Sequence, residues 1–190
     1  MSVAMEEGPR RHRITVEEYH RMAEVGLLAP DARVELIEGE IIDMPPIGIR
    51  HAAAVSRLSR LLERAVGDRA IVRCQLPILL GDCSQPQPDF ALCVPREDFY
   101  EHRPAGAADA LLIIEVSDTT LRYDRQTKMP LYASHGIPEL WIVDTGAEQI
   151  HVFRNPSGTT YGEAFSADKP SAMPIGSLPG VVVDLSSLVG

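Results

Sequence analysis

Long apolar runs, cysteine pairs and the features of a signal peptide are all missing from this sequence of 190 residues. The longest apolar stretches, such as 110–114 and 140–143, are far shorter than the roughly 20 residues of a membrane-spanning helix, so we expect no membrane association. Charged residues stand among the first 13 positions where a signal peptide would need an apolar core, and we therefore expect a cytoplasmic protein. The odd number of cysteines, without CxxC spacing, predicts reduced thiols at Cys74, Cys83 and Cys93.

Positive charge is also scarce. The 18 Lys and Arg residues face 27 Asp and Glu residues, which gives a net charge of −9. Broad coating of nucleic acid requires many basic groups against the phosphates, so this charge disfavours it, whereas a small focused site stays possible. The sequence contains no GxSxG, Walker or GxGxxG motif, which argues against a serine triad and a nucleotide cofactor.

Hydrophobic patterning predicts an α/β fold. We expect residues 1–13 to form a flexible arm and residues 14–190 to form a single domain. Thr15 and Glu18 have capping-box spacing and predict a helix to about Val25. A mixed β-sheet flanked by helices follows from the order of the remaining elements. These are a strand pair within 33–44, helices over 51–66 and 124–135, and strands near 70–80, 90–94, 111–116, 139–144, 149–154 and 159–165; Pro130 predicts a kink in the second helix, or a start near residue 127.

Two acidic residues stand in predicted strands that are otherwise apolar. Asp89 precedes FALCV, and Glu115 lies near the end of LLIIEV. If these strands pair antiparallel, the start of the first lies beside the end of the second, and the two carboxylates become neighbours. Such a pair needs a proton, a basic side chain or a divalent cation between its members. The residues leave two interpretations open: a cation site, or local pairing with Arg122 or Arg125.

Lys128 lies on the helix that follows Glu115, where the chain would fold back over the end of the strand. Lysine is rare here, since Lys128 and Lys169 are the only two. A compact ammonium can approach a water or a phosphate oxygen as a point charge and can lose its proton when it is desolvated. The alternative interpretation is a solvated lysine on an outer helix face.

Four segments together resemble the Uma-type endonucleases, a bacterial family of restriction-endonuclease-like proteins in the PD-(D/E)XK nuclease superfamily. They are VELIEGEIIDMPP, QPQPDFALCV, LLIIEVSDTTLRYDRQTK and LYASHGIPELWIVD. The resemblance extends from about residue 14 to residue 188. It implies a restriction-endonuclease-like core with an extra N-terminal hairpin and C-terminal strands. It also implies metal-dependent hydrolysis of phosphodiester bonds in DNA.

The resemblance assigns roles to individual residues. Asp89, Glu115 and the backbone carbonyl of Val116 would hold Mg²⁺ or Mn²⁺, and the ion would lower the pKa of a bound water. Lys128 would orient this water or offset charge on the phosphate. Ser117 occupies the position where the superfamily usually has its lysine, so that Lys128 resembles a migrated counterpart.

Further positions each allow a functional and a structural interpretation. Glu40 matches an acidic position of the family and is either an accessory ligand or a turn carboxylate. Gln75 either binds a water or phosphate or is an amide on an edge strand. His51 either faces phosphate at the start of its helix or belongs only to the helix entry, and Asp124 is expected to be an N-cap. Arg57, Arg60 and Arg64 either follow a nucleic-acid backbone or form a solvated helix face.

The leading hypothesis is a DNA endonuclease that acts as a homodimer, by analogy with double-strand cutters that need two sites. The alternative is a catalytically inactive module that keeps the nuclease fold and binds nucleic acid or protein. The net negative charge and the serine at position 117 support this alternative. A third hypothesis is an interaction protein that dimerises through an exposed strand over 149–154.

Overall fold

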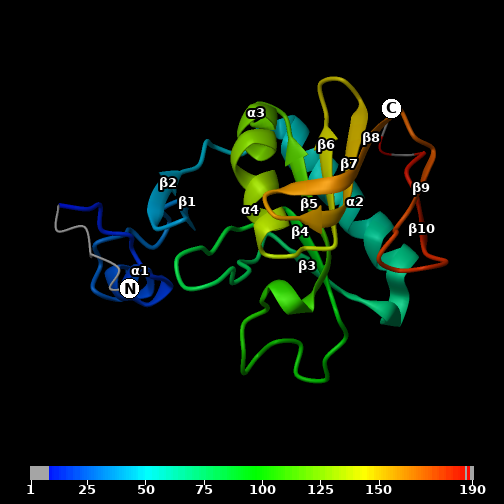
Figure 1. Ribbon diagram of the computed structural model, residues 1–190. Coiled ribbons are helices and arrows are strands. Elements are labelled where there is room, and N and C mark those ends of the chain that lie inside the picture. The colour runs from blue at the N-terminus through cyan, green and yellow to red at the C-terminus, as the bar shows by residue number, and fades with distance from the viewer. Residues whose placement is uncertain (1–8, 187, 189–190) are drawn as a thin grey trace, which may run out of the picture.

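A computed structural model describes residues 9–186 and 188, and a six-stranded sheet lies at its centre (Figure 1). The strand order is β3-β4-β5-β6-β7-β8, in which β5 and β6 are parallel and all other neighbours are antiparallel. The mixed sheet predicted from the sequence is therefore confirmed. The strands are β3 (Ile71–Cys74), β4 (Phe90–Cys93), β5 (Ala110–Ser117), β6 (Glu139–Asp144), β7 (Gln149–Ser157) and β8 (Thr160–Asp168).

Helices cover both faces of the sheet because its central strands are apolar at consecutive positions, which makes both faces of the sheet apolar. Ile114 and Val116 of β5 belong to the core that α2 (Ile49–Val66) closes, together with the hairpin of β9 (Ala172–Pro174) and β10 (Val182–Asp184). Ile113 belongs to the core on the opposite face, under α4 (Met129–Ser134). Side chains of adjacent strand residues point to opposite faces, so Glu115 lies on the α4 face.

The N-terminal unit lies beside the sheet and consists of α1 (Val16–Glu24), β1 (Val34–Ile37) and β2 (Glu40–Asp43) (Figure 1). The predicted capping box is confirmed, because the Thr15 side chain accepts from the N–H of Glu18 while Glu18 accepts from the N–H of Thr15. Residues 38 and 39 form the hairpin turn with positive φ values of 50° and 83°. This turn is attached to the preceding chain by the bond from Ile14 N to Gly39 O at 3.0 Å.

The expected flexible arm over 1–13 falls mostly on residues 1–8, which lie outside the described residues. Arg13, at its end, donates from Nε to the carbonyl oxygen of Glu38 at 2.7 Å. A Cβ added at Gly39 would lie 2.6 Å from the Cβ of Arg13, so this contact depends on glycine at position 39. Arg13 is thus part of the hairpin contact and not of a free arm.

The predicted strand over 70–80 is wrong beyond Cys74. Gln75 has a φ of 49°, a left-handed conformation that ends the extended backbone, and its N–H donates to the carbonyl of Asp89 at 2.9 Å. The chain then turns back on itself, since Leu80 N donates to Ser84 O at 2.9 Å. Alternation of apolar residues after Cys74 therefore reflects burial of a loop and not a longer strand.

The predicted helix over 124–135 begins earlier and contains a π-turn. It starts with α3 (Leu121–Tyr123), widens through η3 (Asp124–Lys128) and continues as α4. The N–H of Met129 donates to the carbonyl of Asp124, which is the i to i+5 bond of a π-turn. This widening accommodates Pro130, which lacks an N–H and would crowd the carbonyl four residues earlier. Asp124 consequently lies inside the helix, and its expected role as an N-cap is wrong.

Several smaller predictions are settled by burial and topology. Trp141 is fully buried, which confirms it as a core residue. The three cysteines are free, and burial raises the pKa of the Cys93 thiol to about 12. The segment 149–154 belongs to β7, which pairs on both sides, so the exposed strand expected there is β8 instead. Within the described part of the chain, no helix is both long and apolar enough to cross a bilayer.

Candidate active site

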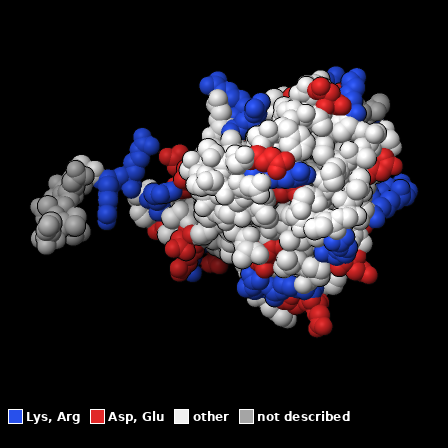
Figure 2. Space-filling model, turned by 45° about the vertical axis from the view of Figure 1, so that its right-hand side comes forward, with Lys and Arg blue, Asp and Glu red and all other residues white. Residues whose placement is uncertain are grey.

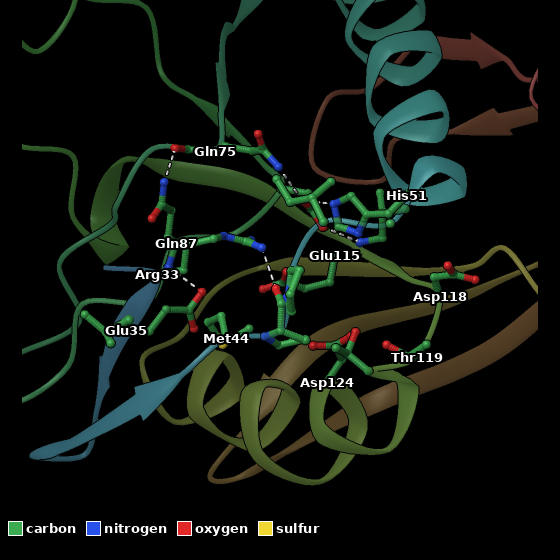
Figure 3. A pocket seen from close by; sticks show the side chains of 18 of the residues that line it. Arg33, Glu35, Met44, His51, Gln75, Gln87, Glu115, Asp118, Thr119 and Asp124 are labelled. Carbon is green, nitrogen blue, oxygen red and sulfur yellow. Dashed lines mark hydrogen bonds and ion pairs between the residues drawn. The ribbon is translucent and has the colours of Figure 1, made fainter. Parts of the chain in front are cut away.

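A cavity of about 360 Å³ opens where the ends of β4 and β5 meet β1, the start of α2 and η3 (Figure 3). Asp89, Glu115 and Lys128 all line it, so the three residues predicted to form the catalytic group meet in one place. The register of β4 against β5 explains why, because Phe90 is opposite Ile114 and therefore brings Asp89 beside the end of β5. Other lining residues include Arg33, Glu35, Met44, Pro45, Pro46, Ile47, Gly48, His51, Gln75, Gln87, Val116, Asp118 and Asp124.

Asp89 is held by three hydrogen bonds. Its Oδ2 accepts from the backbone N–H of Val116 at 2.8 Å, which fixes the carboxylate against β5. Its Oδ1 accepts from Nε2 of His51 at 2.8 Å and from Nε2 of Gln75 at 3.2 Å. The hydrogen bond to Asp89 raises the pKa of His51, although partial burial opposes the shift. His51 and Gln75 therefore contact the site through this carboxylate, from α2 and from the end of β3 respectively.

Glu115 and Lys128 form a buried ion pair on the α4 face of the sheet. Lys128, only 2% exposed, places Nζ 3.2 Å from Oε1 of Glu115. The hydroxyl of Tyr132, one turn further along the helix, donates to the same oxygen at 2.5 Å. Both groups approach Oε1, so Oε2 of Glu115 is the oxygen that this arrangement leaves for another ligand.

Burial and charge act in opposite directions on the pKa values of this pair. Burial raises the pKa of Glu115 well above its usual range, and Lys128 only partly reverses the shift because Asp124, Asp89 and Glu35 are also nearby. Burial would lower the pKa of Lys128, but the attraction of Glu115, Glu35 and Asp124 outweighs it and raises that pKa. The surrounding carboxylates thus favour the charged form of the Lys128 ammonium.

Glu35 is a member of the site that the sequence analysis missed. Glu35 lies on β1, and its Oε1 accepts from Nζ of Lys128 at 3.1 Å and from the N–H of Gln87 at 3.2 Å. Its Oε2 is buried and has no hydrogen-bond partner among the described residues. The signal was present, since Glu35 is an acidic residue between Val34 and Leu36, but interleaved acids made the whole hairpin resemble an amphipathic strand pair.

Two predicted accessory residues lie outside the cavity. Glu40 begins β2 with its side chain 67% exposed and pairs with Nη1 of Arg11 at 3.5 Å, so the expected contact with the site is not formed. Ser117 is buried and donates to Oδ2 of Asp124 at 2.6 Å. Thr120 donates to the same oxygen at 2.7 Å. Ser117 therefore positions the start of the π-turn and does not line the cavity in place of the superfamily lysine.

The donor groups of the cavity fit a divalent cation. Asp89 and Glu115 supply carboxylate oxygens, and the buried Oε2 of Glu35 has no cationic or hydrogen-bonding partner in the part of the chain that the structure describes. Within these residues, no three His, Cys, Asp or Glu side chains already form a metal cage. Mg²⁺ requires only one or two carboxylates because waters complete its octahedral shell, so the pair is sufficient.

Comparison with known proteins identifies the family of the chain. A family model described as "Putative restriction endonuclease", that of the Uma2 family, matches residues 16–186. The chain belongs to the Uma2 family. The resemblance derived from the sequence motifs is thereby confirmed, and the Uma2 match includes every residue of the cavity described above.

A solved structure shares the Uma2 chain's fold. It is the crystal structure of a "putative nuclease belonging to DUF820" from Anabaena variabilis, with a TM-score of 0.70 and 20% sequence identity. The similarity covers 93% of this chain and 97% of that one. The restriction-endonuclease-like fold expected from the sequence is confirmed. No curated protein matches the chain.

Proposed function

We propose that this Uma2-family protein is a metal-dependent endonuclease that hydrolyses phosphodiester bonds of DNA. The supporting observation is the meeting of Asp89, Glu115 and a buried, charged Lys128 in one cavity. A carboxylate pair at the end of two strands, with a cation beside it, is an arrangement suited to phosphate chemistry. Membership of the Uma2 family supports the same reaction class.

Asp89, Glu115 and the carbonyl of Val116 would hold Mg²⁺ or Mn²⁺. When bound, the ion supplies Lewis acidity toward the phosphate and lowers the pKa of a coordinated water. His51 and Gln75 fix the position of Asp89 through its Oδ1, and Tyr132 fixes that of Glu115. These contacts hold both carboxylates in place before substrate arrives, which reduces the ordering needed in the transition state.

Lys128 would act as a fixed positive charge and not as a general base. Its pKa is raised by the surrounding carboxylates, so it keeps its proton at neutral pH. From the floor of the cavity, the ammonium can orient the attacking water and offset charge on the phosphate. Glu35 holds this ammonium from the other side at 3.1 Å and is therefore a positioning residue.

The test is cleavage of supercoiled, single-stranded and branched DNA in Mg²⁺ and in Mn²⁺. We expect wild type to cut at least one substrate, and Asp89→Asn or Glu115→Gln to lose at least a hundredfold in rate, in line with the usual cost of losing such a group (about 10² to 10³). Glu40→Gln is the matched control, since it makes the same chemical change outside the cavity. Cleavage that survives both site substitutions would refute the proposal.

A second candidate is a nuclease-fold module that binds without cutting. The observation that favours it is the ion pair of Lys128 with both Glu115 and Glu35, which satisfies the lysine within the protein. This candidate predicts metal-independent binding of nucleic acid or protein and equal, near-zero turnover by wild type and Glu115→Gln. Metal-dependent cutting that is lost in the variant decides against it.

We also propose that the active form is a homodimer, because cutting both strands of a duplex requires two sites. The edge strand β8 offers unpaired backbone groups for such an association, since among the described residues β7 is its only neighbour in the sheet. Sedimentation across a range of concentrations tests this directly. A monomer at every concentration, alone and with DNA, contradicts it.

A further inference from the structure

A second cavity, of about 300 Å³, lies on the other side of the start of α2 from the active-site cavity. Gly48 and His51 line the active-site cavity, whereas Ile49 and Arg50 line the second one. One turn of chain therefore reaches both spaces. A nucleic-acid strand bound in the active-site cavity could therefore continue past this turn into the second cavity.

The floor of the second cavity is apolar. Ala54 of α2, Val143 of β6 and Ile150 of β7 are buried at its base, and Ala53 forms part of its wall. Its volume is at the lower end of the range for pockets that hold small organic molecules. An apolar floor of this size suits one flat ring system, whose faces are apolar, better than a larger ligand.

The rim of this cavity carries arginines that form no salt bridge with the residues that the structure describes. Arg50 and Arg57 both line it, and the two are seven residues apart on α2. Arg64 follows at the same interval, so the three side chains form one stripe with a rise of about 10.5 Å between neighbours. All three are exposed, and none takes part in a salt bridge with any described residue.

The acidic groups of the same rim are engaged elsewhere. Oε2 of Glu148 pairs with Nζ of Lys169 at 2.5 Å. Oδ1 of Asp144 accepts from the N–H groups of Gly146 and Ala147, each at 2.9 Å. The arginine stripe (Arg50, Arg57 and Arg64) is thus available to an anion, in a protein whose net charge is −9.

The face of the molecule drawn in Figure 2 provides no comparable path. The face drawn in Figure 2 carries blue and red atoms in small mixed groups around a broad uncharged centre, without a continuous basic patch. Ile49, between the two cavities, is 91% exposed, although a large aliphatic side chain gains stability from burial. Exposed aliphatic side chains at nucleic-acid interfaces commonly insert between bases and unstack them.

We propose that this surface binds an unpaired segment of the nucleic-acid strand that passes through the active site. One unstacked base would occupy the second cavity, and the neighbouring phosphates would pair with Arg50 and Arg57, then with Arg64. The ligand is single-stranded or locally opened nucleic acid, because a base that is paired and stacked in a duplex must leave the stack to enter a cavity. This inference rests on the nuclease function proposed above and specifies its substrate.

The first experiment measures the binding of a labelled single-stranded oligonucleotide and of its duplex, in chelator so that no cleavage occurs. Ala53→Leu fills the cavity, and Ala52→Leu is its matched control, because Ala52 is also exposed on α2 but does not line the cavity. We expect Ala53→Leu to weaken single-strand binding by about tenfold, within the range for loss of one base contact. Duplex binding should be unchanged. Equal single-strand affinities for the two variants would overturn the proposal, as would an equal loss for duplex.

The second experiment follows single-strand affinity against salt concentration. Each phosphate contact contributes roughly 0.7 to the slope of log affinity against log salt for single strands. The combined variant Arg50→Gln, Arg57→Gln, Arg64→Gln should therefore lose about 2 from the slope. Arg21→Gln, exposed on α1 in the N-terminal unit and away from α2, should leave the slope unchanged. An unchanged slope in the combined variant would also overturn the proposal.

Cleavage in Mg²⁺, measured separately, distinguishes failure of this inference from failure of the nuclease function. If wild type binds as described but never cuts, the nuclease function fails and the strand-binding surface stands. If wild type cuts and the cavity and stripe variants bind like their controls, the surface fails and the nuclease function stands.

Discussion

The two faces of the central sheet show how one strand can serve stability on one side and chemistry on the other. Toward α2, β5 contributes Leu112, Ile114 and Val116 to a core of apolar side chains. Toward α4, the same strand places Glu115 against the ammonium of Lys128. On the α2 side, called the apolar face below, burial of hydrocarbon stabilises the folded state. On the α4 side, called the polar face below, burial of the charges of Glu115 and Lys128 costs free energy. Such a cost is expected where function requires it.

The largest loss of stability should come from removing the buried cation of the polar face. Lys128→Met removes the cation from Glu115 and Glu35 and leaves two buried carboxylates unpaired, which should lower the free energy of unfolding by about 3–5 kcal/mol. Urea unfolding at neutral pH measures this. Lys169→Met is the matched control, because Lys169 is the other lysine of the chain and is 68% exposed; it should change stability far less. Equal effects of the two variants would show that the buried pair is not important for stability.

A comparable loss of stability should follow from a cavity in the apolar face. Leu58 of α2 is fully buried against β4 and β5, and Leu58→Ala should cost roughly 2–5 kcal/mol in urea unfolding. The cleavage rate per folded molecule should stay unchanged, since Leu58 does not line the active-site cavity. A specific loss of rate at full folding would mean that the two faces are coupled.

Metal addition should stabilise the folded protein through the carboxylates of the active-site cavity. At a Mn²⁺ concentration 100 times the dissociation constant, binding to the folded state adds about 2.7 kcal/mol and raises the Tm of wild type. Asp89→Asn should lose most of this increase, whereas Leu58→Ala should keep it despite its lower starting Tm. An equal increase in wild type and Asp89→Asn would contradict a metal site at Asp89.

The smallest effect is expected at a buried charge far from the catalytic cavity. Arg103 bonds both carboxylate oxygens of Asp109, at 2.7 and 2.8 Å, and lowers the pKa of this carboxyl. A folded-state pKa below the unfolded one contributes stability above the unfolded pKa, near 4, and this contribution disappears as the pH falls through the folded pKa. Asp109→Asn should therefore be slightly less stable than wild type at pH 7, and the difference should shrink as the pH falls below about 4. A difference that does not shrink as the pH falls would assign the loss to packing instead of charge.

Much of this architecture was predictable because it depends on local pattern. The capping box of α1, the hairpin turn at residues 38 and 39 and the helix ending at Gly67 each follow from residues close in the chain. The proximity of Asp89 and Glu115 was predictable from one added assumption, that their strands pair antiparallel. The strand over 70–80 failed because apolar alternation does not distinguish a buried loop from a strand.

The sequence by itself determined which residue types are available: oxygen donors at the ends of apolar strands, and a lysine at position 128 in a chain with only two lysines. Only the tertiary structure decided which of them meet. Glu35 lies 93 residues before Lys128 and contacts it, whereas Glu40, from the same hairpin, faces solvent. The π-turn that carries Lys128 depends on Pro130 and on the bonds from Ser117 and Thr120 to Asp124. Long-range contacts of this kind are set by packing between elements, and no local pattern encodes them.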